Sequence, residues 1–322
     1  MEYVNFGKAG VRVSRLAFGL GLRGQDDAAE AQRAIEHAID QGINLIDCAN
    51  VYGLMDDRAN IRVSEAILSR AIKGKRDDVL ITSKVGSEVG RGPNDQGLSR
   101  YHIMREVETS LRQLDTDHID FYLVHRFDEP TPLEETVRAL DDLVHSGKVR
   151  YVGCCNHEAW QVCKALWVAD RLNAVPYMAV QNMYSLLNRH LEKEMFPLLR
   201  DTGQGAMAYS PLHIGLLSGL YTPGAPPPPG SLFASRPPAA YAAMAGEEAQ
   251  KVMATVIELA GELGKTPAQL ALAWVLSHPE ITLAITGADT AAHLDDNLGA
   301  VGWTLDETVR EKLDAISVPF VR

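Results

Sequence analysis

Short apolar runs alternate with helical stretches along most of this 322-residue chain. The runs have the length of buried strands, and the stretches between them place apolar residues at the spacing of amphipathic helices. Strands that alternate with helices favour a parallel sheet, and eight such units close into a barrel. We therefore predict an α/β fold, a (β/α)8 TIM barrel formed by residues 1–322 as a single domain. Its strands are expected at 16–19, 45–47, 79–84, 119–125, 149–155, 178–181, 205–210 and 281–285.

Two segments depart from this repeat. Residues 2–18 alternate apolar and polar side chains around a Lys8-Ala9-Gly10 turn, which predicts an N-terminal β-hairpin before the first barrel strand. Residues 218–246 are rich in proline and follow the seventh strand, so we expect a long loop without regular structure at the catalytic mouth. It is either a cofactor or substrate lid or a merely mobile loop. Capping boxes predict helix starts at residues 131–134 and 266–269, each with proline at the first helical position.

Composition narrows the possible partners. The net charge of −11 argues against nucleic acid, because phosphate binding needs a basic face. The chain has no run of 18 apolar residues and no signal-peptide pattern at its start, so we expect a cytoplasmic protein that does not enter membranes. The four cysteines lack metal-ligand spacing and are expected to be free thiols, without a metal. The sequence leaves open whether the protein is a monomer or a homo-oligomer.

Four polar residues stand at the ends of predicted strands or just beyond them: Asp47, Tyr52, Lys84 and His125. In a parallel barrel these strand ends converge on one mouth. An ammonium group lowers the pKa of a nearby phenol, so we expect Lys84, held by Asp47, to make Tyr52 a general acid toward a carbonyl oxygen. His125 would donate a second hydrogen bond to that oxygen. Reduction also requires an electron pair at carbon, and a nicotinamide hydride is the simplest source.

The segment from Leu45 to Gly53, Leu-Ile-Asp-Cys-Ala-Asn-Val-Tyr-Gly, resembles the first signature of the aldo-keto reductases. Residues 13–19, 81–84, 123–128 and 147–153 are similar to further blocks of that family in the same order. The resemblance extends from about residue 3 to residue 300. It implies an NADPH-linked carbonyl reductase on a (β/α)8 barrel, with Tyr52 as the proton donor.

The same resemblance implies a set of cofactor contacts. Asn156 and Gln181 would hydrogen-bond the nicotinamide carboxamide, and Tyr209 would stack on the nicotinamide ring. Tyr209 could instead be core packing and Asn156 only a turn residue, whereas a buried Gln181 needs partners. The remaining contacts would come from a loop over the pyrophosphate and from the adenosine end: Ser210, Leu212, Gly215, Leu217, Gly287, Asp289, His293 and Asn297.

Several positions depart from the family pattern. Cys155 replaces the usual serine and offers a weaker hydrogen bond, and Leu220 stands where relatives often carry a lysine. Near the adenosine 2′ position the chain offers Asp289, whose carboxylate repels a 2′-phosphate and accepts a hydrogen bond from a 2′-hydroxyl. We therefore expect NADP(H) as the cofactor with weakened preference, so that NAD(H) is possible. Arg236 in the proline-rich loop could still reach the phosphate.

The substrate and the alternatives stay open at this point. Arg23, Arg91 and Arg126 follow predicted strands and would suit a sugar, keto-acid or phosphorylated aldehyde, or else are surface residues. The main hypothesis is an oxidoreductase acting on a small carbonyl or alcohol in either direction. One alternative is a nicotinamide-binding regulatory subunit with little turnover, like the related β-subunits of potassium channels. Another is a barrel hydrolase or aldolase that uses Lys84 as a Schiff base.

Overall fold

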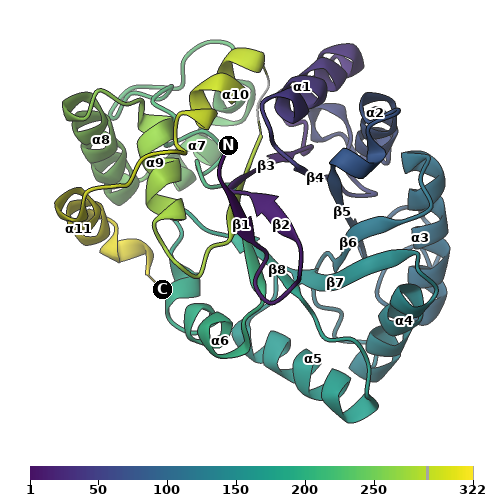
Figure 1. Ribbon diagram of the computed structural model, residues 1–322. Coiled ribbons are helices and arrows are strands. Elements are labelled where there is room, and N and C mark those ends of the chain that lie inside the picture. Colours follow the sequence, from purple (N-terminus) through teal and green to yellow (C-terminus); the bar gives the residue numbers. More distant parts are fainter. Residues whose placement is uncertain (288–289, 322) are drawn as a thin grey trace.

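The computed structural model describes residues 1–287 and 290–321. Eight parallel strands close into a barrel in the order β10-β3-β4-β5-β6-β7-β8-β9, which confirms the predicted architecture (Figure 1). Pairing of Ala284 with Leu16 joins the last strand to the first. The strands are β3 (Leu16–Gly19), β4 (Leu45–Asp47), β5 (Leu80–Val85), β6 (Ile119–Val124), β7 (Val149–Cys155), β8 (Ala179–Met183), β9 (Gly205–Tyr209) and β10 (Leu283–Thr286).

Helices surround the barrel as an outer layer (Figure 1). Their apolar faces pack on the outward side chains of the strands, and neighbouring helices also contact one another. Within the described residues the α-helices are α1 (Ala28–Asp40), α2 (Val63–Ala71), α3 (Arg100–Leu114), α4 (Leu133–His145), α5 (Ala159–Leu172), α6 (Met195–Thr202), α7 (Pro238–Met244), α8 (Glu247–Glu262), α9 (Pro267–Leu276), α10 (Ala291–Leu298) and α11 (Glu307–Ile316).

The N-terminal hairpin lies across one end of the barrel, as expected (Figure 1). Its strands β1 (Tyr3–Asn5) and β2 (Arg12–Ser14) pair in antiparallel register. Phe6, in the turn between them, is fully buried, and its ring centroid lies 4.6 Å from that of Phe121 inside the barrel. A Cβ at Gly205 would lie 2.3 Å from the Phe6 ring, so only glycine lets the ring sit this deep.

The proline-rich segment 218–246 is more ordered than the sequence predicts. It contains a 3-10 helix at Leu232–Ser235 and the short helix α7. Tyr221, Phe233 and Tyr241 pack against one another with ring centroids 5.5 to 5.7 Å apart. These three aromatic side chains form a local core, which is why this long connection adopts regular structure.

Of the two predicted capping boxes, one is confirmed and one is wrong. At α9, Thr266 accepts from the Gln269 N–H at 3.2 Å, and Gln269 accepts in return from Thr266 N–H. At α4, Pro132 is itself the N-cap residue and makes no side-chain cap bond. Thr131 therefore lies one residue before the capping position, and its hydroxyl donates to Asp128 at 2.6 Å.

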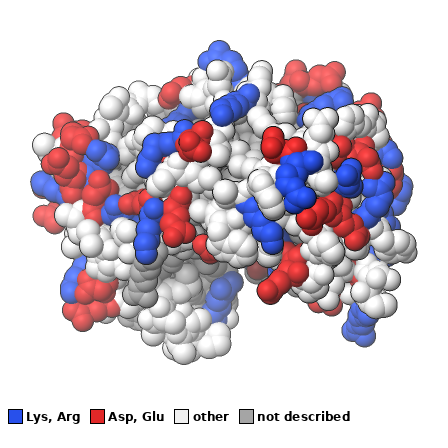
Figure 2. All heavy atoms as spheres, turned by 90° about the horizontal axis from the view of Figure 1, so that it is seen from below, with Lys and Arg blue, Asp and Glu red and all other residues white. Residues whose placement is uncertain are grey.

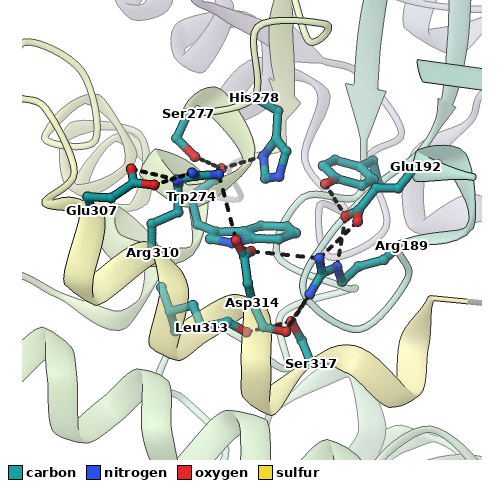
Figure 3. A network of polar contacts seen from close by, with 11 residues as sticks. Arg189, Glu192, Trp274, Ser277, His278, Glu307, Arg310, Leu313, Asp314 and Ser317 are labelled. Atoms are coloured by element: carbon teal, nitrogen blue, oxygen red, sulfur yellow. Dashed lines mark hydrogen bonds and ion pairs between the residues drawn. The ribbon is translucent and has the colours of Figure 1, made fainter. Parts of the chain in front are cut away.

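A buried arginine attaches the C-terminal helix to the loop after β8 (Figure 3). Arg189 donates to both carboxylate oxygens of Glu192 at 2.7 and 2.8 Å, and to Ser317 Oγ and Asp314 O at 2.7 Å. Trp274 of α9 donates from Nε1 to Asp314 Oδ1 at 2.8 Å, and the Arg189 guanidinium lies 5.3 Å from its ring. We call this group the C-terminal clamp.

On the face shown in Figure 2, acidic and basic side chains are interspersed rather than gathered by sign. This distribution fits the balance of 42 acidic and 31 basic residues in the chain. Of the helices that the structure describes, none has the length and apolar content needed to cross a lipid bilayer.

Candidate active site

Lys84 and Asp47 form a buried ion pair inside the barrel. Asp47 ends β4, Lys84 lies near the end of β5, and the two strands are neighbours in parallel register. Lys84 Nζ donates to both carboxylate oxygens of Asp47 at 2.8 Å and to the Cys48 carbonyl at 2.9 Å. Lys84 is fully buried and Asp47 is 4% exposed, so each depends on the other to remain charged there.

Tyr52 and His125 complete the group at the carboxyl ends of these strands. The Lys84 ammonium lies 4.8 Å from the centroid of the Tyr52 ring. The rings of Tyr52 and His125 meet edge to face, with centroids 5.8 Å apart and an angle of 74°. The structure therefore brings together all four residues that the sequence analysis singled out.

His125 is held in place by a serine that the sequence analysis missed. His125 follows β6, and its backbone N–H donates to the Val85 carbonyl at 2.8 Å. Its ring Nδ1 lies 3.2 Å from Ser87 Oγ, and Ser87 is buried. This contact restrains the orientation of the ring through Nδ1. Only the position of Ser87, just beyond a predicted strand, could have suggested it from sequence.

The pKa of Tyr52 does not move in the expected direction. The sequence argument held that Lys84 lowers it, and the positive charge of Lys84 does act that way. Burial acts in the opposite direction and is larger, so the pKa of Tyr52 is raised to about 12. For Lys84, burial alone would lower the pKa, but the carboxylate of Asp47 reverses this and raises it. Tyr52 is therefore a protonated phenol beside a permanent ammonium group.

Gln181 finds its partners within the protein. Its Nε2 donates to Asp47 Oδ1 at 2.8 Å, and its Oε1 accepts from the Cys155 thiol at 3.4 Å. Burial raises the pKa of Cys155 to about 12, so Cys155 remains a thiol donor. Nε2 also donates to Met207 Sδ at 3.5 Å, so Gln181 does not require a cofactor to explain its burial.

Asn156 and Tyr209 lie together at the mouth. The Tyr209 hydroxyl donates to Asn156 Oδ1 at 2.7 Å, and Asn156 Nδ2 donates to the His125 carbonyl at 2.9 Å. Asn156 is exposed and has a φ of 57°, a conformation that asparagine tolerates better than most residues. Asn156 is thus a turn residue and also presents its amide beside the tetrad. Tyr209 is half-buried, so it is not simply core packing.

The loop after β9 has a strained backbone. Ser210, His213 and Ile214 have φ values of 49°, 48° and 56°, and Gly215 follows at 89°. A left-handed conformation is unfavourable for a β-branched residue such as Ile214, and such strain gathers at ligand sites. Leu212 is half-buried, whereas Leu217 is buried. The Leu217 N–H donates to the Leu212 carbonyl at 3.2 Å.

The residues predicted at the adenosine end lie on or before α10. Gly287 and His293 are exposed, Asn297 is buried, and Asp289 is outside the described residues. A groove of about 620 Å³ away from the tetrad is lined by Ser218, Gly219 and Asp296, together with residues of α8 and α9. The groove therefore lies between the loop after β9 and α10, where Asp296 precedes Asn297.

The three arginines predicted near the substrate are all exposed. Arg126 lies close enough to the site for its charge to lower the pKa of Cys155, against the larger effect of burial. Arg23 acts in the same way on Tyr209 and forms an ion pair with Asp56 at 3.9 Å. Arg91 lies in the loop between β5 and α3, with no contact to the tetrad among the described interactions.

Sequence comparison matches residues 15–318 to the Aldo/keto reductase family. The chain belongs to this family. Its relatives include an uncharacterized oxidoreductase, YrpG, of Bacillus subtilis, 38% identical over 98% of this chain and 96% of the relative. A probable voltage-gated potassium channel subunit beta of Arabidopsis thaliana is 38% identical over 94% of this chain and 91% of the relative. The L-glyceraldehyde 3-phosphate reductase of Escherichia coli K12 is 33% identical over 94% of this chain and 88% of the relative.

Membership of the aldo/keto reductase family makes the chain an NAD(P)H-dependent oxidoreductase. The donor set at the mouth fits such a cofactor. The Gln181 amide contacts the buried Asp47, and the Cys155 thiol links it to the Asn156 amide; a strained loop with a glycine at its turn follows Tyr209. These are the residues that could hold the cofactor.

Proposed function

We propose that the protein interconverts a small carbonyl compound and its alcohol, with Tyr52 as the general acid and base. The observation that supports this most is the position of Lys84, 4.8 Å from the Tyr52 ring and bonded to both oxygens of Asp47. The ammonium stabilises the phenolate that remains after proton donation, and Asp47 keeps the ammonium charged. When bound, a nicotinamide cofactor supplies or accepts the hydride.

His125 would donate a second hydrogen bond to the substrate oxygen. Its ring lies 5.8 Å from the Tyr52 ring, centroid to centroid, so both side chains are within reach of one small substrate group. Ser87 at Nδ1 keeps the ring in this orientation. Two donors on one oxygen stabilise the negative charge that develops there during hydride transfer.

The deciding experiment compares the wild type with Tyr52→Phe on a panel of aldehydes, ketones and sugars, in both directions. Phenylalanine keeps the ring and removes only the proton. We expect kcat to fall by about 10² to 10⁴-fold while the cofactor Kd stays unchanged. Tyr101→Phe, which alters a tyrosine 63% exposed on α3, is the control. A Tyr52→Phe enzyme that turns over normally contradicts the role of Tyr52.

For the cofactor we propose NADP(H), with NAD(H) also accepted. The support is the sequence of the adenosine end, which offers Gly287, Asp289 and His293 where many relatives have lysine or arginine. A carboxylate disfavours a 2′-phosphate and accepts a hydrogen bond from a 2′-hydroxyl. The Kd values for NADPH and NADH test this. Tighter NADPH binding by about 100-fold or more, equivalent to ~2.7 kcal/mol, would refute shared use.

For the substrate we propose a polar or anionic carbonyl compound. Arg126 and Arg23 act electrostatically on Cys155 and Tyr209 at the site, and guanidinium groups suit carboxylates and phosphates. The reductase of Escherichia coli named for L-glyceraldehyde 3-phosphate makes a phosphorylated aldehyde a natural member of the test panel.

A nicotinamide-binding regulatory subunit is the second candidate. The observation in its favour is the 38% identity to the Arabidopsis protein named as a probable potassium channel β subunit. It predicts tight cofactor binding with negligible turnover of every panel member, so the same screen separates the two functions. We further propose that residues 1–322 act as one domain, which predicts a single cooperative unfolding transition.

The Schiff-base alternative is disfavoured by the environment of Lys84. Its ammonium makes three hydrogen bonds, to the two oxygens of Asp47 and to Cys48 O, and its pKa is raised. A nucleophilic amine must instead be neutral. Borohydride treatment with a carbonyl substrate should therefore leave no adduct on Lys84.

A further inference from the structure

The loop that carries Tyr52, residues 48–53, is anchored by the start of α2. Ser64 N–H donates to the Tyr52 carbonyl at 3.1 Å, and Ser64 Oγ donates to the Ala49 carbonyl at 3.0 Å. Arg62 N–H donates to the Asn50 carbonyl at 3.0 Å. The position of the Tyr52 ring therefore depends on where residues 62–64 lie.

Glu106 of α3 joins the two sides of this anchor. Its Oε2 accepts from Asn50 Nδ2 at 3.1 Å and from Arg62 Nη2 at 2.8 Å. Asn50 is fully buried and Glu106 is 2% exposed. One carboxylate oxygen of Glu106 thus binds two segments. It contacts the Tyr52 loop at Asn50, and it contacts the segment that anchors this loop at Arg62. In Figure 1, α2 and α3 lie side by side outside β5, and their packing fixes the distance between these partners.

Arg62 needs this partner because its backbone is strained. Its φ of 69° is left-handed, which brings Cβ close to the following carbonyl. Such a conformation persists only where the surroundings hold it. Among the described residues, Arg62 Nη1 and Asn50 Oδ1 find no hydrogen-bond partner, so no other side chain shares the task through those atoms.

We propose that Glu106 is a positioning residue for Tyr52, acting through Asn50 and Arg62. It touches neither substrate nor cofactor, and its effect on the reaction passes through the placement of the Tyr52 hydroxyl beside Lys84. The inference rests on the proposed role of Tyr52 as general acid.

The test is a double-mutant cycle with Glu106→Gln and Tyr52→Phe. Glutamine has the same shape, but it loses the charge that both donors share. We expect Glu106→Gln to lower kcat by about 10 to 100-fold, because a misplaced catalytic group loses rate steeply, with the substrate KM and the cofactor Kd changed by less than about threefold. In the Tyr52→Phe background the same change should lower the residual rate by less than about twofold, since a residue that acts through Tyr52 has nothing left to position.

Asp120→Asn is the matched control. Asp120 is also a buried carboxylate that joins an arginine to a backbone N–H, through Arg76 at 2.7 Å and Ile81 at 2.8 Å, at the start of β5 and β6. It should lower the unfolding temperature as Glu106→Gln does while leaving kcat within about twofold of the wild type.

Each failure has its own signature. Normal turnover by Tyr52→Phe overturns the proposed function. Loss of activity in Tyr52→Phe together with a wild-type kcat in Glu106→Gln overturns this inference alone, and so do fully additive losses in the double variant. If Glu106→Gln does not fold, Asn50→Ala replaces it in the cycle, because Asn50 is the partner of Glu106 on the Tyr52 loop. A wild-type kcat or fully additive losses would then overturn the inference in the same way.

Discussion

Gln181 on β8 and Asp47 on β4 are joined across the barrel interior by a hydrogen bond of 2.8 Å from Nε2 to Oδ1. The two strands are four places apart in the barrel order, so the bond links opposite walls. Asp47 thereby receives donors from both Gln181 and Lys84. Gln181, which the family resemblance assigns to the cofactor, is thus also a hydrogen-bond partner of Asp47, the residue that keeps Lys84 charged.

Gln181→Met should destabilise the fold. Methionine has a similar volume but no N–H, so the buried Asp47 loses one hydrogen bond, and bonds to charged groups are worth ~1.5 to 3 kcal/mol. Urea unfolding measures the change. Gln32→Met is the control, because the hydrogen bonds of Gln32 with Glu36 and with Arg70 of α2 lie near the surface, and the change should alter stability by less than ~0.5 kcal/mol. Equal effects of the two substitutions would count against a structural role for the bond.

Arg189→Met should release the C-terminal clamp. The substitution leaves the half-buried Glu192 without its ion-pair partner and frees Ser317 and Asp314, and breaking a buried pair in this way costs ~3 to 5 kcal/mol. Hydrogen exchange should show faster exchange in α11 before other helices. Arg33→Met, which affects an exposed pair with Glu30 within α1, should change little. Uniform exchange across the chain would contradict this prediction.

Glu192 should make stability sensitive to acid. Burial alone would raise its pKa, but hydrogen bonds from Arg189 and Tyr184 lower it below the ordinary value. A carboxyl group with a lowered folded pKa stabilises the fold above its unfolded pKa of about 4.3, and this contribution disappears as the pH falls through the folded value. The free energy of unfolding, measured from pH 7 to pH 3, should therefore fall more steeply for the wild type than for Glu192→Gln. Parallel curves would exclude Glu192 as a source of the dependence.

Carbonyl reduction should not lose its acid near neutral pH. Because burial raises the pKa of Tyr52 to about 12, the phenol stays protonated from pH 6 to pH 9. Its protonation should therefore produce no alkaline fall in kcat/KM for reduction across this range. Oxidation needs the phenolate and should become faster as pH rises. An alkaline limb near pH 8 in reduction that disappears in Tyr52→Phe would show that the phenol is more acidic than the structure indicates.

Arg126→Met should separate anionic from neutral substrates. Arg126 is exposed beside His125, and its charge reaches Cys155. We expect KM for a phosphorylated aldehyde to rise by about tenfold, ~1.4 kcal/mol, with little change for the matching neutral aldehyde. Arg91→Met, which alters an arginine without a described contact to the tetrad, is the comparison. If KM rises equally for both aldehydes, Arg126 does not recognise the phosphate.

Much of the fold could be predicted from the sequence because barrel strands are short and buried on both faces. The strands 45–47 and 149–155 have the predicted bounds, and the polar residues at the strand ends converge as parallel topology requires. The capping box at Thr266 was also readable, because it involves only local bonds. The box at Thr131 was not, since α4 begins one residue later than the motif requires and Pro132 occupies the N-cap position.

The electrostatics of the site required the folded structure. The sequence places an ammonium near a phenol, but it does not tell how deeply the phenol is buried, and burial decides the direction in which the pKa of Tyr52 moves. Glu106 was missed for a similar reason. It lies three residues after Ile103, on the apolar stripe of α3, and a charged residue on such a stripe is the signal that could have identified it.

The hairpin that seats Phe6 against Phe121 closes the barrel at the end opposite the tetrad. Apolar side chains fill the interior above it, among them Leu45, Leu123 and Met207. Among the described residues, the hairpin end of the barrel is therefore filled by side chains, and the carboxyl ends of the strands are the side from which a molecule can reach Tyr52.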